Sequence, residues 1–202
     1  MNDKLKNIIS IIIQNDAQHA KWLNTLSMME NTGARKISAS EHKTGVTLMV
    51  LKHAAEEARH AFYLKKQISK LAPINQFSDY SSATLLSPLT SLQYLHRLDV
   101  ELCRYLKNDL KKSGRDLVFG AYLLVTYAIE VRAGELYPIY QEILDANHSK
   151  VNVKSIIAEE ETHLEEMLHQ MKSFFGDTWN EVAEYSEKVE RRYFEEWVES
   201  II

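Results

Sequence analysis

The 202-residue sequence has few of the residues that interrupt helices or cross-link a chain. It contains only 6 glycines and 3 prolines, so few tight turns are available and long helices are favoured. Its single cysteine, Cys103, excludes an internal disulfide and a metal centre built from Cys-x-x-Cys pairs. These absences indicate a reduced, helical protein, and they favour the cytoplasm as its location.

The sequence also lacks a long apolar segment and a block of positive charge. Its longest apolar run, from Ile8 to Ile13, is interrupted by Ser10 and is far shorter than the ~20 residues that a membrane-spanning helix requires. The first residues show no secretory signal. The net charge is -4, with no useful run of Lys and Arg. We therefore expect neither a membrane nor a nucleic acid as partner.

Apolar residues recur at helical spacing through nearly all of the sequence, without a convincing strand pattern. The pattern predicts long helices over about residues 4–37, from Ser38 or Ser40 to about Leu71, over 115–146 and over 151–175. A loop over 73–88 and a helix over 90–112 lie between the hairpins, and a last helix covers about 178–200. Pro138 predicts a kink or an early end in its helix. We expect one all-α domain, residues 1–202, with a four-helix core over about 4–175, a long crossover that carries an extra helix, and an added C-terminal helix.

One short motif occurs twice, a hundred-odd residues apart. The two copies are Ala55-Glu56-Glu57-Ala58-Arg59-His60 and Ala158-Glu159-Glu160-Glu161-Thr162-His163. Each contains Glu-x-x-His, which places a carboxylate and an imidazole one turn apart on the same helix face. Both motifs interrupt an otherwise apolar stripe, where charged groups are costly unless they are paired or bound to a metal. Two such motifs predict two halves of one metal site.

Each hairpin partner supplies a further acid, Glu30 or Glu130. Both follow an apolar residue and precede a pair of small residues, which would let the helices approach closely. Glu30 precedes Glu57 by 27 positions and Glu130 precedes Glu160 by 30, so antiparallel hairpins can bring the paired groups to similar heights. Asp16 and His19 lie about three turns away from Glu30, and Glu135 points about 140° away from Glu130. We therefore expect six groups to converge: Glu30, Glu57, His60, Glu130, Glu160 and His163.

Four carboxylates and two imidazoles are the ligands that a four-helix bundle uses for two iron or manganese ions. On these six positions, over roughly residues 4–175, the sequence resembles the ferritin-like superfamily of di-iron carboxylate proteins. The resemblance implies an antiparallel four-helix bundle that holds two iron ions, with manganese as the alternative. It also implies that Glu57 and Glu160 bridge the metals, that Glu30 and Glu130 are terminal ligands, and that His60 and His163 each bind one metal.

The resemblance implies an oxidase or oxygenase that activates dioxygen and hydroxylates or oxidises a small, largely apolar substrate. The crossover helix and the C-terminal helix offer walls for a substrate pocket. A separate electron-donor protein is expected because no flavin, NAD or iron–sulfur motif is present. No catalytic residue beyond the metal centre is expected, and the Tyr- and Trp-rich last helix either caps the bundle or forms a homodimer surface.

Other interpretations remain open. Iron storage with ferroxidase activity predicts a large hollow shell, which the chain length and the long connection between hairpins fit poorly. A metal-free helical interaction module requires the four ligand glutamates to face solvent. Manganese catalase and a transfer-RNA hydroxylase share the fold, although the acidic balance makes an RNA substrate less attractive.

Several neighbours of the six residues have simpler expected roles. His53 lies one turn before Glu57 and is expected to be hydrogen-bonded behind the ligands or within the core. Tyr127 is expected to pack with its hydroxyl bonded to a carboxylate. The remaining glutamates of the motif helices are expected to be exposed charges: Glu56, Glu159, Glu161, Glu165 and Glu166.

Overall fold

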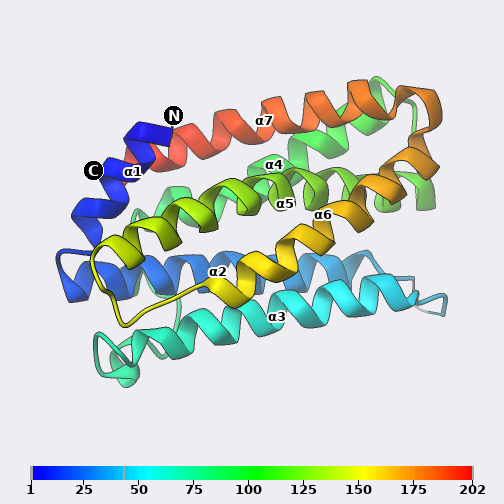
Figure 1. The fold of residues 1–202 in the computed structure, drawn as a ribbon. Coiled ribbons are helices and arrows are strands. Elements are labelled where there is room, and N and C mark those ends of the chain that lie inside the picture. The colour runs from blue at the N-terminus through cyan, green and yellow to red at the C-terminus, as the bar shows by residue number, and fades with distance from the viewer. Residues whose placement is uncertain (1, 43, 202) are drawn as a thin grey trace.

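The computed structural model describes residues 2–42 and 44–201 as helices joined by short connections, with no strand among these residues (Figure 1). The α-helices are α1 (Asn2–Ile12), α2 (Asp16–Ser40), α3 (Leu48–Ile68), α4 (Pro88–Asn108), α5 (Gly114–Ala146), α6 (Lys154–Phe175) and α7 (Trp179–Ser200). Single 3₁₀ turns are η1 (Ile74–Phe77), η2 (Ser82–Thr84) and η3 (Gly176–Thr178). Two antiparallel pairs, α2 with α3 and α5 with α6, carry the most extensive packing. The expectation of an all-helical bundle is confirmed.

The two hairpins are joined by a connection that crosses the length of the bundle. In Figure 1, α3 and α5 run in the same direction, so the chain between them must return to the starting end. Helix α4 makes this return and packs on α2, α5 and α7. Helix α7 packs on α4, α5 and α6. The predicted crossover helix and C-terminal helix therefore cover the same side of the core.

The first predicted helix, over residues 4–37, is two helices. Helix α1 ends at Ile12 and α2 begins at Asp16. The side-chain oxygen of Asn15 accepts hydrogen bonds from the backbone N–H groups of Ala17 and Gln18, at 3.0 and 3.1 Å. Such an N-cap supplies partners for N–H groups that have none at a helix start. The prediction of one continuous helix was wrong because the cap outweighs the apolar periodicity.

The second helix begins later than predicted. Helix α2 continues through Ser40, whose hydroxyl donates back to the carbonyl of Ile37 at 2.7 Å, so neither Ser38 nor Ser40 is an N-cap. Thr47 caps α3 instead, because its hydroxyl oxygen accepts a hydrogen bond from the Val50 N–H at 3.3 Å.

Helix α5 passes through Pro138 and continues to Ala146, so the predicted early end is wrong. The proline removes the donor that would bond the carbonyl of Gly134. Both residues lie on the exposed face of α5, where water can satisfy that carbonyl, while buried Tyr137 and Ile139 fix the helix against the core. The lost hydrogen bond is therefore inexpensive here.

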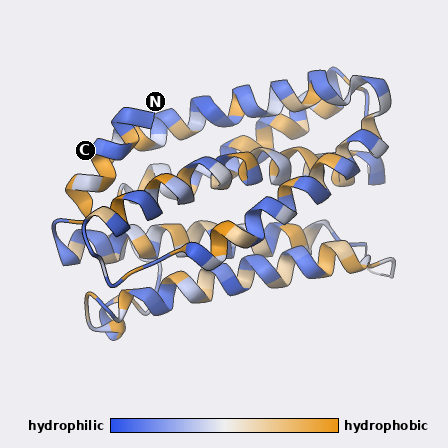
Figure 2. Ribbon diagram, viewed as in Figure 1, coloured by the Kyte–Doolittle hydropathy of each residue, from blue (hydrophilic) through white to orange (hydrophobic). Residues whose placement is uncertain are grey.

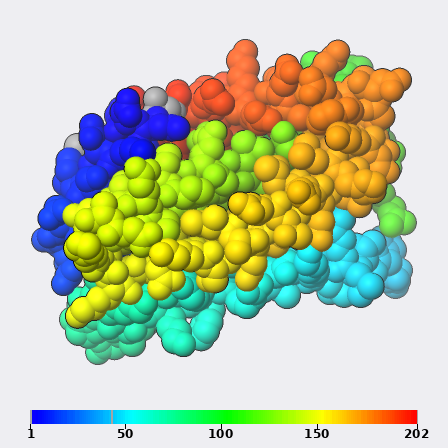
Figure 3. All heavy atoms as spheres, in the orientation of Figure 1, coloured from blue at the N-terminus to red at the C-terminus, as the bar shows by residue number. Residues whose placement is uncertain are grey.

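Hydrophobic and hydrophilic residues alternate along the helices (Figure 2), as expected when each helix buries one face. Helix α5 is long and apolar enough to cross a membrane, but 61% of its 18-residue apolar window is buried inside the bundle. In the space-filling view it appears as a strip between α1, α6 and α7 (Figure 3). Burial of most of this window indicates that α5 is a core helix of the bundle.

Candidate metal centre

The structure brings all six predicted ligand residues together in the interior of the bundle, from helices α2, α3, α5 and α6. The exposed fraction is 6% for Glu57, 2% for His60 and Glu130, 4% for Glu160 and 1% for His163, and Glu30 is partly buried. Their side chains form two overlapping groups, each with its ligand atoms within 4.8 Å of one another. The groups are Glu30, Glu57 and His60, and Glu57, Glu130, Glu160 and His163. The cluster could hold a metal ion.

Both histidines turn their Nδ1 atom toward the cluster and their Nε2 atom away from it. The Nε2 atom of His60 lies 2.8 Å from a carboxylate oxygen of Glu159, and Nε2 of His163 lies 2.8 Å from one of Glu56. An ionised carboxylate only accepts hydrogen bonds, so each Nε2 carries the hydrogen and donates it. In the neutral ring, Nδ1 then presents its lone pair to the carboxylates, 3.1 Å from Glu160 in His60.

The pairing of histidines with carboxylates is crossed between the two hairpins. Glu56 of α3 orients the histidine of α6, and Glu159 of α6 orients the histidine of α3. A carboxylate behind a ligating histidine fixes the tautomer and the ring orientation, as is usual at metal sites. Both glutamates are partly buried, so the expectation that they are exposed charges was wrong. Their identical place before the ligand glutamate in both motifs was the signal that sequence reasoning missed.

Several buried atoms of the cluster lack a hydrogen-bond partner. Among the described residues, the unpartnered buried side-chain atoms are Nδ1 of His60, Nδ1 of His163, Oε2 of Glu130 and Nε1 of Trp22. Leaving such an atom unsatisfied costs about 1–3 kcal/mol. Three of these atoms face the same small volume, and one or two cations placed there would give each a partner. The residues present therefore fit a bound metal.

The charges of the cluster also favour a cation. Burial and the neighbouring Glu30 raise the pKa of Glu57 well above its ordinary value, and burial and Glu160 do the same to the pKa of Glu130. Burial alone would raise the pKa of Glu160, but the neighbouring Glu130 and the two histidines lower it. Burial opposes protonation of His60 and His163, yet the nearby Glu160 carboxylate raises the pKa of both. Without a metal, the cluster must retain protons to offset its negative charge.

Tyr137 is a cluster neighbour whose role the sequence did not reveal. Its hydroxyl donates to a carboxylate oxygen of Glu30, and its ring is buried. It lies seven residues after Glu130, on the same face of α5. Tyr127 has the carboxylate partner that was expected, but this is Glu187 of α7, at 2.6 Å and outside the cluster.

The rival residues of the sequence analysis are engaged elsewhere. Both ring nitrogens of His53 are occupied, by the Tyr122 hydroxyl at 2.9 Å and by Glu166 at 2.8 Å, so His53 is a hydrogen-bonded core histidine. That contact makes Glu166 partly buried, whereas Glu161 and Glu165 are exposed as expected. Glu135 pairs with Arg132. His19 is hydrogen-bonded to Tyr140, and Asp16 is exposed.

The small residues beside Glu30 and Glu130 form the pairs Gly33-Ala34 and Ala133-Gly134. Both alanines are buried in the core. A Cβ atom at Gly33 would lie 3.5 Å from Oε2 of Glu57, which is an ordinary contact, and a Cβ at the exposed Gly134 would meet nothing within 4 Å. The packing therefore does not require glycine itself at either position.

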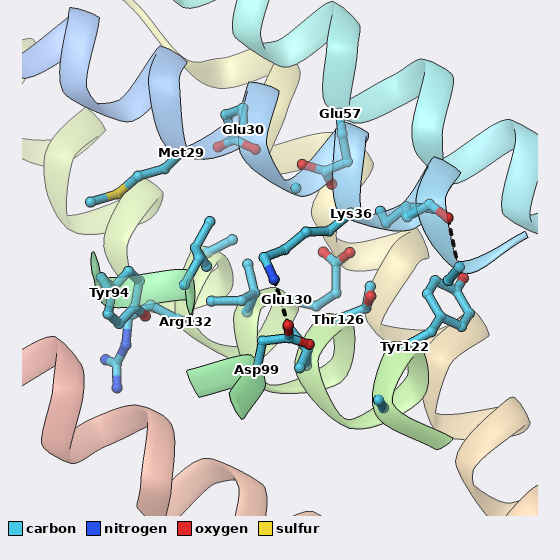
Figure 4. Close-up of a pocket in the computed structure, with 18 of the residues that line it drawn as sticks. Met29, Glu30, Lys36, Glu57, Tyr94, Asp99, Tyr122, Thr126, Glu130 and Arg132 are labelled. Atoms are coloured by element: carbon cyan, nitrogen blue, oxygen red, sulfur yellow. Dashed lines mark hydrogen bonds and ion pairs between the residues drawn. The ribbon is translucent and has the colours of Figure 1, made fainter. Parts of the chain in front are cut away.

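A cavity of about 320 Å³ adjoins the cluster, and Glu30, Glu57 and Glu130 line it (Figure 4). Most of its wall is apolar and comes from α2, α4, α5 and α7, so the crossover and C-terminal helices do form walls of a pocket. Its polar lining includes Lys36 of α2 and Asp99 of α4, which form an ion pair at 2.6 Å. A cavity of this size lies in the range that binds small molecules.

Comparisons of the chain with protein-family models, with curated proteins and with solved structures found no match. The candidate metal centre therefore rests on the geometry of its own residues. That geometry comprises six converging ligand groups, two oriented imidazoles and an apolar cavity at their side.

Proposed function

We propose that this chain is a ferritin-like, non-haem di-iron enzyme, with manganese as the alternative metal, that uses dioxygen to hydroxylate or oxidise a small apolar substrate. One observation carries the proposal: the Nδ1 atoms of His60 and His163, buried and unpartnered, face a shared set of carboxylates. The two groups of ligand atoms overlap at Glu57, which suits one cation in each group. Oxygen ligands with one nitrogen per metal favour iron or manganese over copper or zinc.

The contacts support a distinct role for each proposed ligand. Glu57 belongs to both groups, and Glu160 contacts both histidines, so these two carboxylates are suited to bridge. Glu30 with His60 and Glu130 with His163 would complete the two ends. When bound, two ferrous ions together supply two electrons to one dioxygen molecule. Hydroxylation of a C–H bond consumes one dioxygen, two electrons and two protons, yields an alcohol and water, and draws its electrons from a separate donor protein.

The residues around the cluster would prepare it for this chemistry. Glu56 and Glu159 keep the hydrogen of each imidazole on Nε2, so that Nδ1 stays available to a metal. The Tyr137 hydroxyl orients Glu30 and holds a proton at its oxygen beside the cluster. The apolar cavity walls exclude water from the face where Glu30, Glu57 and Glu130 meet a substrate.

The burial of Glu57, Glu130 and Glu160 supports a metal site over a metal-free interaction module, which requires these glutamates to face solvent. Iron storage with ferroxidase activity is the second candidate, since the same ligands serve it. The apolar cavity at the cluster supports an enzyme, because storage requires no pocket for an organic molecule. We also propose that the protein acts in the cytoplasm, as a monomer or homodimer.

Metal loading tests the proposal directly. Metal-free protein is incubated anaerobically with ferrous ion, freed of excess by gel filtration and submitted to elemental analysis. We expect about two iron ions per chain. Glu160→Gln and His163→Gln should lose at least one of them, and Glu161→Gln, at an exposed neighbouring position, should retain both. Protein that binds zinc alone, or no metal, would contradict the proposal.

Two further measurements separate the enzyme from a storage protein. Size-exclusion chromatography should show a monomer or dimer, whereas a storage shell elutes at hundreds of kilodaltons. With a chemical reductant and air, the iron-loaded enzyme should consume dioxygen over repeated turnovers without accumulating mineral iron. Uptake of many iron ions per chain would favour storage.

A further inference from the structure

The cavity beside the candidate metal centre is elongated along α2. It is lined from Leu26 to Ser40 of this helix, a span of fourteen residues or about 21 Å. Its volume is about 320 Å³ and most of its wall is apolar. An elongated, apolar cavity of this kind suits a ligand with an extended hydrocarbon chain.

One end of the cavity is closed and the other is open. Leu26, Leu95, Phe194 and Trp197 form the closed end, and all four are buried. At the other end the lining residues Ala39 and Val118 are exposed. In Figure 1, α2 and α4 run toward this opening and α5 runs away from it. The late residues of α2 and α4 and the early residues of α5 therefore lie at the same, open end of the cavity. A chain-like ligand would enter with its apolar end first and leave its other end at the opening.

The Lys36–Asp99 pair lies on the open side of the ligand carboxylates, and its side chains are 31% and 33% exposed (Figure 4). Arg132, the other cation in the lining, is buried and bonded to Glu190 through two nitrogens, at 2.9 and 2.8 Å, so it is not available. An ion pair that is about one-third exposed contributes little to stability, and a ligand carboxylate can replace Asp99 at Lys36. The segments around the opening, residues 35–42 and 99–116, contain seven Lys and Arg and five Asp and Glu. Their net charge is therefore positive, whereas the net charge of the whole chain is -4. This charge favours an anionic head group.

We propose that the cavity binds an unbranched fatty acid, with its carboxylate at Lys36 and its chain running past Glu30 toward Trp197. An extended chain advances about 1.2 Å per bond, because three bonds span 3.3–3.6 Å. The closed end lies ten residues, or about 15 Å, from the level of Lys36. The best ligand therefore has about twelve to fourteen carbons.

The position of Lys36 also determines which carbons of the fatty acid lie beside the candidate metal centre. This inference rests on the proposed function. Glu30 lies six residues, or about 9 Å, from Lys36 along α2. That distance corresponds to about seven bonds, so the C–H bonds beside the carboxylates belong to the middle of the chain.

Binding is measured by the change in tryptophan fluorescence, since Trp197 closes the cavity, with saturated fatty acids from octanoate to octadecanoate below their micelle concentrations. Affinity should rise about fourfold per added methylene until the chain fills the cavity, and then stop rising. Equal affinities at all lengths, or no binding, would overturn the inference. Because metal-free protein is used in parallel with iron-loaded protein, failure of metal loading beside length-dependent binding removes only the proposed function. Normal metal loading without fatty-acid binding removes only this inference.

Two pairs of variants test the two ends of the cavity. Leu95→Trp at the closed end should shift the preferred length to shorter chains, whereas Leu92→Trp, on the exposed face of α4, should not. Lys36→Met should weaken fatty-acid binding about two- to fivefold and leave the primary alcohol of the same length unaffected, and Lys21→Met, on the same helix outside the cavity, should change neither. Equal losses for acid and alcohol would place the head group elsewhere. If Leu95→Trp fails to fold, the Lys36 pair still decides the orientation.

Discussion

Replacing Glu56 with alanine should weaken metal binding without unfolding the protein. Its Oε2 atom accepts the hydrogen bond from Nε2 of His163 at 2.8 Å, and its ion-pair neighbour Arg59 is as far as 3.8 Å away. The substitution therefore leaves all six ligands in place and removes the group that orients one imidazole. Loss of a carboxylate behind a ligand histidine typically lowers metal affinity by about 10- to 100-fold.

The expected effect can be expressed as a change in stability. At a free metal concentration of about 100 times the dissociation constant, binding to the folded state adds about 2.7 kcal/mol to the free energy of unfolding. At the same concentration, a tenfold weaker site adds about 1.4 kcal/mol and a hundredfold weaker site about 0.4 kcal/mol. In a protein of this length, 1 kcal/mol shifts Tm by about 2–4 °C. The wild type should gain about 5–11 °C, and Glu56→Ala about 1–6 °C.

Thermal unfolding followed by circular dichroism provides the assay, with manganous ion as a probe that resists oxidation in air. The control is Glu161→Ala, which removes an exposed carboxylate beside a ligand on α6 and should keep the full gain. The three proteins should unfold at similar temperatures without metal. A full gain in Glu56→Ala would refute the orienting role of Glu56, and a wild type with no gain would refute the metal centre itself.

Three other substitutions test the packing around the site. Burial lowers the pKa of His19 from 6.5 to about 4, so below pH 6.5 the unfolded chain takes up a proton that the folded state excludes. Stability should therefore fall by about 2 kcal/mol between pH 7 and pH 5, and urea unfolding of His19→Gln should lack that part of the loss. Glu190→Ala leaves buried Arg132 without its bidentate partner and should cost about 3–5 kcal/mol in urea unfolding, and a cost under 1 kcal/mol would contradict this. Gly134→Ala should raise Tm, by the equivalent of about 0.5–1 kcal/mol in the free energy of unfolding, because position 134 is helical and has space for a methyl group. A lower Tm would indicate a contact at this position that the structure does not show.

The residues of the candidate metal centre could be predicted from sequence because they interrupt the apolar stripes of their helices. Glu57 and His60 occupy positions where the helical stripe calls for apolar side chains, and a charged group there needs a partner. Glu56 and Glu159 could not be predicted in this way, because they lie about 100° around their helices, at positions that face solvent in most helices. Their burial depends on how α3 and α6 pack against each other. The sequence pattern within a single helix carries no information about that packing.

The helix boundaries and the cavity show two other limits of sequence reasoning. The apolar periodicity continues through Asn15, where the helix breaks. The boundary between α1 and α2 depends on whether the Asn15 side chain caps a new helix or the backbone continues the old one. The cavity is a space left between side chains of several helices, from Leu26 on α2 to Trp197 on α7. Its existence was suggested by the two extra helices, but its length and its closed end follow only from packing.

The crossed hydrogen bonds between α3 and α6 make the candidate metal centre depend on both hairpins. Each hairpin contributes an imidazole whose supporting carboxylate belongs to the other hairpin, so neither half can assemble its own share of the site. Bound cations would thus cross-link the two hairpins, in addition to the hydrogen bonds that already join α3 to α5 and α6. Withdrawing the metal should let the hairpins separate from each other before either one comes apart, and hydrogen exchange would show this first at the seam between α3 and α6.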